Sequence, residues 1–215
     1  MSDDPKSLAA ALRAEAALVL IPAYNAAKYL DELIPRCREY VCDENLLFVN
    51  DGSTDDTLAL LKKHGVNYIT FPENRGKGAA LKAGYAYGIE RGYRSVLTLD
   101  ADLQHLPEDL PRFFALDDGR RIVIGTRRMD LAIMPFARWL TNNLTSMIIS
   151  VFSTQRVRDS QSGYRLIPTK VLRAIPLRTV GYDFESELLF KAGALRVTVA
   201  EVEIATIYED RKSVV

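Results

Sequence analysis

Two aspartates follow directly on an apolar run in the stretch LTLDADLQHLPEDL, residues 97–110. Side chains alternate along an extended chain, so Asp100 and Asp102 project to the same side. Two carboxylates that face each other repel, and one of them is driven toward protonation unless a cation lies nearby. Mg²⁺ and Mn²⁺ prefer such oxygen ligands, typically one or two carboxylates together with phosphate oxygens and water. The pair therefore predicts a divalent cation site, and the alternative is a capping turn before Pro107.

A second candidate site is the glycine-rich stretch NRGKG, residues 74–78, which opens a segment of helical periodicity. Glycines let the backbone approach a ligand closely, and the amides at a helix N-terminus suit an anion. Arg75 and Lys77 add positive charge to this loop. Taken alone, the stretch is also compatible with an ordinary turn and helix cap. Together with the cation site, it predicts a site for a nucleoside diphosphate.

Short apolar runs alternate with helical segments through the first part of the chain. Strands are expected in residues 16–25, 45–50, 66–71, 95–102 and 121–127, and helices in residues 26–40, 56–65, 74–92 and 107–118. This alternation predicts an α/β fold with a mainly parallel central sheet that is flanked by helices. We expect Asn25 to cap the first helix, and Ser53, Thr54 and Asp55 to cap the second. In such sheets, ligands bind beyond the carboxyl ends of the strands, where the polar clusters of this sequence occur.

The later part of the chain changes character. Residues 131–153 form a long apolar segment that contains several polar side chains, and residues 158–168 read as a polar loop that leads into a short strand. Residues 184–195 are expected to form a helix in which Glu185 and Glu187 favour the helix dipole, with a role at the substrate as the alternative. Residues 196–210 alternate like a half-exposed strand. We predict one domain over residues 1–215, with a nucleotide and metal half at about 16–130 and an acceptor half at about 131–215.

Composition and the distribution of apolar residues argue against several classes of protein. The 215 residues include 28 basic and 28 acidic side chains, and this balance argues against nucleic-acid binding. Cys37 and Cys42 show no metal-ligand pattern and are expected to be reduced, as in a cytoplasmic protein. The first residues lack the basic start of a signal peptide. No apolar run reaches the roughly 18–20 residues that span a bilayer, so we expect no membrane crossing.

Six motifs in order resemble glycosyltransferase family 2. They are IPAYN, VNDGSTDDT, NRGKGAALKAGY, DADLQH, GTR and DSQSGYR, and the resemblance extends over about residues 16–210. Within the family, they are most similar to the dolichol-phosphate mannosyltransferase and polyprenyl-phosphate glycosyltransferase branch. The resemblance implies a GT-A fold, a Rossmann-like nucleotide-diphospho-sugar transferase. It also implies transfer of a hexose, mannose or glucose first, from a nucleotide-diphosphate sugar to a polyprenyl or dolichyl phosphate at the cytosolic membrane face.

The resemblance also implies roles for individual residues. On the nucleotide side, they are Pro22, Tyr24 and Asn25 along the nucleoside, Asp51 at the base, and Arg75 and Lys77 beside the nucleotide. Apart from the resemblance, we expect Arg211 to add positive charge at the leaving diphosphate. Asp100 is placed at the ribose, and the ligands of Mg²⁺ or Mn²⁺ are placed at Asp100, Asp102 and Gln104. On the acceptor side, the residues are Arg127 and Arg138 at the acceptor phosphate, and Asp159, Gln161 and Arg165 at the sugar end.

The chemistry of the acceptor suggests how the reaction runs. A lipid phosphate is already an anion at neutral pH and needs positive side chains, such as Arg127 and Arg138, rather than a strong base. We therefore expect inversion by direct displacement, with Asp159 as general base should the acceptor be a hydroxyl group.

Several departures and alternatives limit this assignment. The spacing of Gln161 and Arg165, without a tryptophan, disfavours a processive polysaccharide synthase. Without a membrane span, the chain is expected to dock peripherally through residues 131–153, to act with a separate membrane subunit or as a homodimer, or to be a trimmed piece. Two alternative functions are a glycosyltransferase for a soluble or protein hydroxyl acceptor and a non-catalytic subunit that binds nucleotide sugars.

Overall fold

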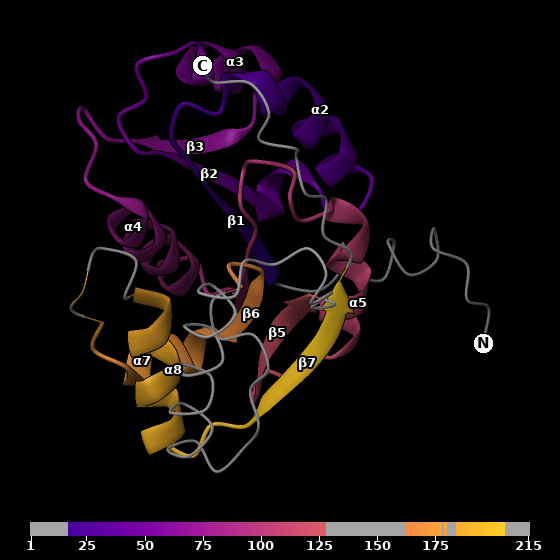
Figure 1. Ribbon diagram of the computed structural model, residues 1–215, viewed down its shortest axis with the longest axis vertical. Helices are drawn as coiled ribbons and strands as arrows, with labels where there is room; N and C mark the ends of the chain where they lie inside the picture. Colours follow the sequence, from indigo (N-terminus) through magenta and orange to yellow (C-terminus); the bar gives the residue numbers. More distant parts are fainter. Residues whose placement is uncertain (1–16, 128–161, 178, 180–183, 205–215) are drawn as a thin grey trace, which may run out of the picture.

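The computed structural model describes residues 17–127, 162–177, 179 and 184–204. Seven strands form one sheet in the order β3-β2-β1-β4-β6-β5-β7 (Figure 1). They are β1 (Ala17–Ala23), β2 (Leu46–Asn50), β3 (Asn67–Thr70), β4 (Ser95–Thr98), β5 (Ile122–Arg127), β6 (Arg165–Pro168) and β7 (Val199–Ile204).

Strand direction confirms the predicted mainly parallel sheet. The pairs β1–β2, β2–β3, β1–β4 and β5–β7 are parallel, whereas β6 is antiparallel to both β4 and β5. All strands except β6 therefore point the same way, and their carboxyl ends share one edge of the sheet. Because β6 comes from the later part of the chain and lies between β4 and β5, the two halves expected from the sequence are built into one sheet.

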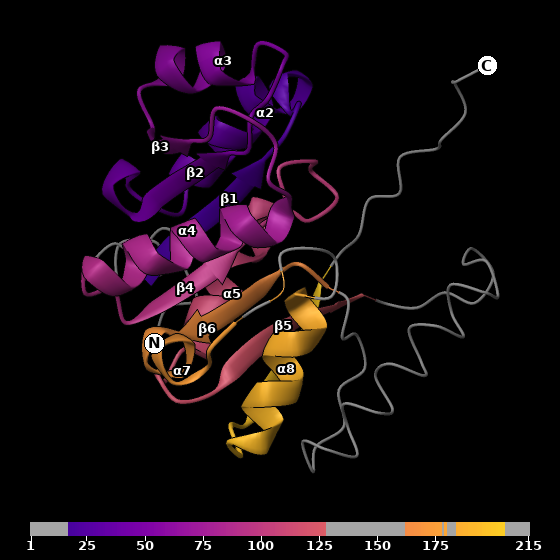
Figure 2. The ribbon, with the colours of Figure 1, turned by 90° about the vertical axis from the view of Figure 1, so that its left-hand side faces the viewer.

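Helices cover both faces of this sheet. They are α2 (Ala27–Arg38), α3 (Thr57–His64), α4 (Lys77–Glu90), α5 (Leu110–Ala115), α7 (Thr169–Ala174) and α8 (Phe184–Ala194), with short 3₁₀ helices at Asp43–Asn45 and Pro107–Asp109. Helices α2, α3 and α5 pack on one face, and α4, α7 and α8 pack on the other (Figures 1 and 2). No helix in these described ranges is long and apolar enough to cross a membrane.

The sequence pattern explains why these elements form and how they pack. Helix α2 buries Leu30, Leu33, Ile34 and Cys37, whose spacing puts them on one side of a helix. Strand β1 is buried along most of its length because its alternate side chains enter two different cores, one on each face of the sheet. A strand that is covered on both faces is consistent with the nearly continuous apolar run in the sequence.

Several local predictions need correction. Asn25 does not cap α2, because its backbone takes a left-handed conformation (φ 50°) and its side chain bonds to Thr54. The Asp55 carboxylate instead accepts hydrogen bonds from the amide of Ala27 in α2 and the amide of Thr57 in α3, so it serves both helices. The segment expected to be helical from residue 107 begins as a 3₁₀ helix before α5. The strand expected over residues 95–102 ends at Thr98, so Asp100 and Asp102 lie beyond it, in a segment that turns at residues 101–102, and strand alternation does not set their directions. Helix α7, after β6, was not predicted.

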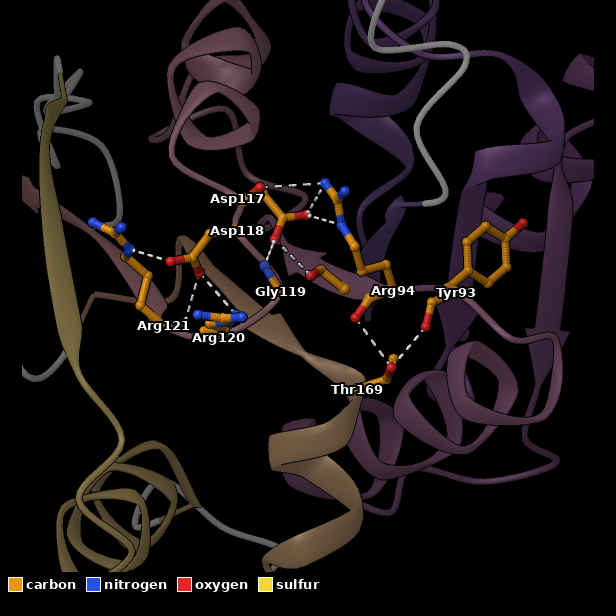
Figure 3. A network of polar contacts seen from close by, with 9 residues as sticks. Tyr93, Arg94, Asp117, Asp118, Gly119, Arg120, Arg121 and Thr169 are labelled. Atoms are coloured by element: carbon orange, nitrogen blue, oxygen red, sulfur yellow. Dashed lines mark hydrogen bonds and ion pairs between the residues drawn. The ribbon is translucent and has the colours of Figure 1, made fainter.

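A polar network closes the edge of the sheet opposite the carboxyl ends (Figure 3). The Asp117 carboxylate is fully buried and accepts hydrogen bonds from the Arg94 guanidinium, the Ser95 hydroxyl and the Gly119 amide. The Thr169 hydroxyl donates to the Tyr93 carbonyl at 2.7 Å. These bonds join the starts of β4, β5 and α7, and they make this edge a structural one.

Candidate functional site

The carboxyl edge of the sheet gathers the motifs that the sequence placed in separate segments. Strands β1, β2 and β4 end there, and they lead into Tyr24, Asp51 and Asp100 respectively. Strand β6 runs the other way, so its first residues lie at the same edge, with Arg165 opposite Thr98. The Thr98 hydroxyl donates to the Gly163 carbonyl at 2.7 Å and ties the two segments together.

Asp51 organises the glycine-rich loop. One oxygen of its carboxylate accepts the amide hydrogen of Arg75 and the other accepts that of Gly76, both at 2.8 Å. Asp51 is buried, and a Cβ atom on the neighbouring Gly52 would lie 2.2 Å from the main chain of Glu73. The β2 turn and the loop before α4 therefore pack backbone to backbone. A contact between Asp51 and a nucleotide base stays a prediction, and the carboxylate observed here holds the loop.

The residues expected along the nucleoside form a neighbouring rim. The Asn25 amide donates to the Ser53 hydroxyl at 3.0 Å, and the Asn25 side-chain oxygen accepts the Thr54 amide hydrogen at 2.9 Å. Pro22 is part of β1 and is half-buried, whereas Tyr24 is 50% exposed. The loops after β1 and β2 are thus joined, and the Tyr24 ring is accessible to a ligand that approaches this edge.

Lys77, the first residue of α4, lies between two carboxylates. Its Nζ atom is 2.7 Å from Asp100 Oδ1 and 3.1 Å from Glu185 Oε1. Burial alone would raise the pKa of Asp100, but the Lys77 ammonium lowers it below its usual range. Burial alone would likewise lower the pKa of Lys77, but Asp100 and Glu185 raise it. Lys77 and Asp100 are therefore both charged at neutral pH.

Asp102 is placed differently from Asp100. Its Oδ1 accepts the Gln104 amide hydrogen at 3.1 Å, and it has no ion pair among those resolved in the described ranges. Burial raises the pKa of Asp102; the Gln104 amide opposes that rise, and the negative Asp100 adds to it. A nearby cation would stabilise the charged form of this carboxylate, which its present surroundings disfavour.

The fit of a divalent cation can be judged from this donor set. Within the part of the chain that the structure describes, no three His, Cys, Asp or Glu side chains converge as a metal site. Mg²⁺ and Mn²⁺ nevertheless bind nucleotide sites through only one or two protein carboxylates, with phosphate and water as the other ligands. Asp102 fits that arrangement, and Gln104 is exposed beside it. Asp100 is less open because Lys77 already contacts its Oδ1.

Gly163 lets the polar loop before β6 pack against this cluster. A Cβ atom at position 163 would lie 2.5 Å from Asp100 Oδ2 and 3.0 Å from Lys77 Nζ. Arg165 is buried, and its guanidinium donates to the carbonyls of Ser162 (2.6 Å) and Glu185 (2.9 Å). Arg165 thus joins two main-chain segments beside the site, and its contact with the sugar stays a prediction.

The structure describes only some of the other predicted site residues. Arg75 is exposed, with its guanidinium 5.0 Å from the centre of the Phe71 ring. Arg127 ends β5, at the same edge of the sheet as Asp100. The predicted site residues Arg138, Asp159, Gln161 and Arg211 and the predicted interfacial segment 131–153 lie outside the described residues.

Glu185 is not among the predicted site residues, because its position in the first turn of a helix favoured the helix-dipole interpretation over a substrate role. Only the fold brings α8 next to the N-terminus of α4, where Glu185 contacts Lys77. His105, which follows the aspartates in the sequence, is buried; its ring packs against Tyr164, and its Nδ1 lies 4.0 Å from Asp100 Oδ2.

Comparison with known proteins identifies the family of this chain. The family described as Glycosyl transferase family 2 matches residues 18–180. An undecaprenyl-phosphate mannosyltransferase from Micrococcus luteus is 30% identical, with 88% of this chain and 83% of that protein covered. A polyprenol monophosphomannose synthase from Mycolicibacterium smegmatis is 32% identical, with 87% and 76% covered.

A solved structure shows the same fold. Glucosyl-3-phosphoglycerate synthase from Mycobacterium tuberculosis, in complex with Mn²⁺, uridine diphosphate and phosphoglyceric acid, superposes with a TM-score of 0.71. The sequence identity is 20%, and the match covers 97% of this chain and 76% of that chain. The fold is therefore GT-A, as expected. The chain belongs to glycosyltransferase family 2, and it is a glycosyltransferase.

Proposed function

We propose that this glycosyltransferase moves a hexose from a nucleotide-diphosphate sugar to a polyprenyl phosphate, with inversion at the sugar carbon. Mannose and glucose are the first candidates for the sugar. The observation that carries the proposal is that the Asp102 carboxylate and the loop that Asp51 fixes before the N-terminus of α4 lie at the same edge of the sheet. The family relatives that are named for sugar transfer to undecaprenyl phosphate or polyprenol support the lipid acceptor.

The residues of this chain supply positioning for the donor. By holding the amides of Arg75 and Gly76, Asp51 fixes the loop so that the N-terminus of α4 points toward the diphosphate. Arg75 adds positive charge from an exposed position, and Tyr24 and Asn25 line the nucleoside side. Asp102 and Gln104 hold Mg²⁺ or Mn²⁺. When bound, the cation neutralises charge on the departing nucleoside diphosphate.

The acceptor phosphate needs no general base. Its oxygen attacks the anomeric carbon from the side opposite the nucleoside diphosphate, the bond to the diphosphate breaks, and the sugar configuration inverts. Arg127 and Arg138 are assigned to the acceptor anion, which they would hold against the negative donor, and Arg165, Gln161 and Asp159 are assigned to contacts with the sugar. Arg211 adds positive charge at the diphosphate. The reaction takes place at the cytosolic membrane face, with the protein bound peripherally.

A transfer assay tests this proposal. Purified protein is incubated with Mn²⁺ and, in turn, GDP-mannose, UDP-glucose and UDP-N-acetylglucosamine, with undecaprenyl phosphate in detergent as acceptor. Products are identified by mass spectrometry. We expect one donor to give a glycosyl phospholipid, and undecaprenol, which lacks the phosphate, to give none. Transfer to undecaprenol or to a peptide hydroxyl, without transfer to the lipid phosphate, would select the alternative hydroxyl-acceptor function. Donor binding without any transfer would select the non-catalytic subunit.

A further inference from the structure

Glu185 is the residue of the site whose contribution the proposed mechanism leaves open. It lies in the first turn of α8, and its carboxylate contacts the same ammonium group as Asp100 does. The side chains of Lys77, Asp100 and Glu185 are 33%, 25% and 16% exposed, respectively. The three groups therefore interact in a partly desolvated place, where charges act more strongly on one another than in water.

The structure holds Glu185 in place from its main-chain side. Arg165 donates one hydrogen bond to the Glu185 carbonyl and another to the Ser162 carbonyl. The adjacent Gly163 packs against both Asp100 and Lys77. Glu185 is thus connected in two ways to the segment after β4 that bears the aspartates. Its side chain is connected through Lys77, and its backbone is connected through Arg165. A freely moving surface glutamate would have no such double connection.

Because Lys77 is shared, more of the negative charge of the Asp100 carboxylate stays uncompensated. An ammonium group between two carboxylates compensates each of them only in part. With an uncharged side chain at position 185, Lys77 would interact with Asp100 alone and would cancel more of the Asp100 charge. With the Glu185 carboxylate present, the ammonium group is shared between two carboxylates. More of the negative charge of Asp100 then remains for a cation held at Asp102.

We propose that Glu185 is a positioning residue for the cation and donor: by sharing Lys77 with Asp100, it preserves the negative charge that Asp102 and Asp100 present to a divalent cation. This inference rests on the proposed function, since it concerns the same cation and nucleotide site. It gives α8 a part in the donor half of the reaction, although this helix lies in the half of the chain that the sequence assigned to the acceptor.

The test measures Mn²⁺ binding directly. Free Mn²⁺ is followed by electron paramagnetic resonance while the protein is titrated with Mn²⁺ in the presence of GDP or of UDP. The variants are E185Q, which keeps the shape of the side chain, E185D, which keeps its charge, and E187Q. Glu187 lies on the same helix but contacts Thr179 and Lys191, so E187Q is a matched control for general disturbance of α8. Thermal melting shows that each variant is folded.

We expect E185Q to weaken Mn²⁺ binding about fivefold, the size of a typical coupling within one ion-pair network. E185D should recover part of the loss, and E187Q should bind Mn²⁺ as the wild type does. In the K77Q background, E185Q should have almost no further effect, because Glu185 acts through Lys77. K77R, which keeps a cation there, should retain the effect.

Two results would overturn the inference while leaving the proposed function intact. The first is a folded E185Q variant with wild-type Mn²⁺ affinity, whatever its melting temperature. The second is an equal loss from E185Q in the presence and absence of Lys77, which would mean that Glu185 acts by its own field. If the wild-type protein binds no Mn²⁺ with either nucleotide, the cation site of the proposed function fails and this inference fails with it.

Discussion

Asp51 and Gly76 are joined by a hydrogen bond of 2.8 Å from the glycine amide to the carboxylate, and the second carboxylate oxygen accepts the Arg75 amide hydrogen at the same distance. A buried acid at the end of β2 thereby sets the path of the main chain into α4. The Asp51 carboxylate therefore sets the conformation of the loop that we expect to face the donor diphosphate. This relationship makes Asp51 a residue on which both loop order and donor binding depend.

Replacing Asp51 with Asn should loosen the loop. An amide side chain can accept one of the two hydrogen bonds but turns its NH₂ group toward the other amide, which leaves a buried donor unsatisfied. We expect stability to fall by about 1–3 kcal/mol and the KM for the donor to rise about tenfold with a smaller change in kcat. Urea unfolding and initial-rate kinetics measure these effects. D56N, which changes an exposed carboxylate of the same turn, should differ little from the wild type. Equal kinetics for D51N and D56N would contradict this role.

Removing the cation or its carboxylate should abolish transfer. Treatment with EDTA, or the substitution D102N, leaves the charge that develops on the leaving diphosphate without its main compensation. We expect the rate to fall about a hundredfold or more, which corresponds to the several kcal/mol that a metal ion contributes to such a step. Adding Mn²⁺ back should restore the EDTA-treated wild type but not D102N. A D102N enzyme with nearly full Mn²⁺-dependent activity would show that Asp102 is not the ligand.

The buried Asp117 should matter for stability but not for donor binding. Its carboxylate accepts hydrogen bonds from Arg94, Ser95 and Gly119 at the edge opposite the site (Figure 3). In D117A, these donors lose a buried acceptor, and we expect a loss of about 3 kcal/mol in the free energy of unfolding. The control is D118A, because Asp118 is exposed and should change the unfolding midpoint far less. Donor affinity should stay the same in both variants; a specific loss of donor binding in D117A would mean that the two edges are coupled.

The contact between Arg36 of α2 and Glu108 should make stability depend on pH. The Arg36 guanidinium donates to both carboxylate oxygens of Glu108, at 2.9 and 2.8 Å, and this lowers the pKa of Glu108 below its ordinary 4.5. A carboxyl group with a lowered folded-state pKa stabilises the fold above the unfolded pKa, and this contribution disappears as the pH falls through the folded value. Because Glu108 is 43% exposed, the contribution at pH 7 should be about 1 kcal/mol or less.

Urea unfolding of the wild type and E108Q at a series of pH values measures this contribution. The two proteins should differ at pH 7, and the difference should shrink as the pH falls below 4.5 and through the lowered folded-state pKa of Glu108. E39Q changes the residue directly after α2, whose side chain has no partner among the described contacts, and it should follow the wild type at every pH. A difference that does not shrink as the pH falls below 4.5 would assign the stabilisation to something other than the charge of Glu108.

The sequence by itself determined the elements and the edge at which they act. Hydrophobic spacing in α2 and the unbroken apolar run of β1 follow from burial on one face or on two, which is a property of each segment alone. The aspartates at the ends of β2 and β4 could be assigned to one edge because parallel strands in an α/β fold present their carboxyl ends together. The six ordered motifs indicated the family, and the comparisons confirmed it.

Only the tertiary structure decided how distant segments meet. The insertion of β6 between β4 and β5 places Gly163 against Asp100, and the packing of α8 beside α4 places Glu185 against Lys77. The side chain of Asn25 turns to the β2 loop, although its position in the chain suited a helix cap. These contacts depend on strand order and on the packing of helices across a sheet, which no local periodicity specifies. The charge balance of the site, with one lysine between two carboxylates, is a product of that packing.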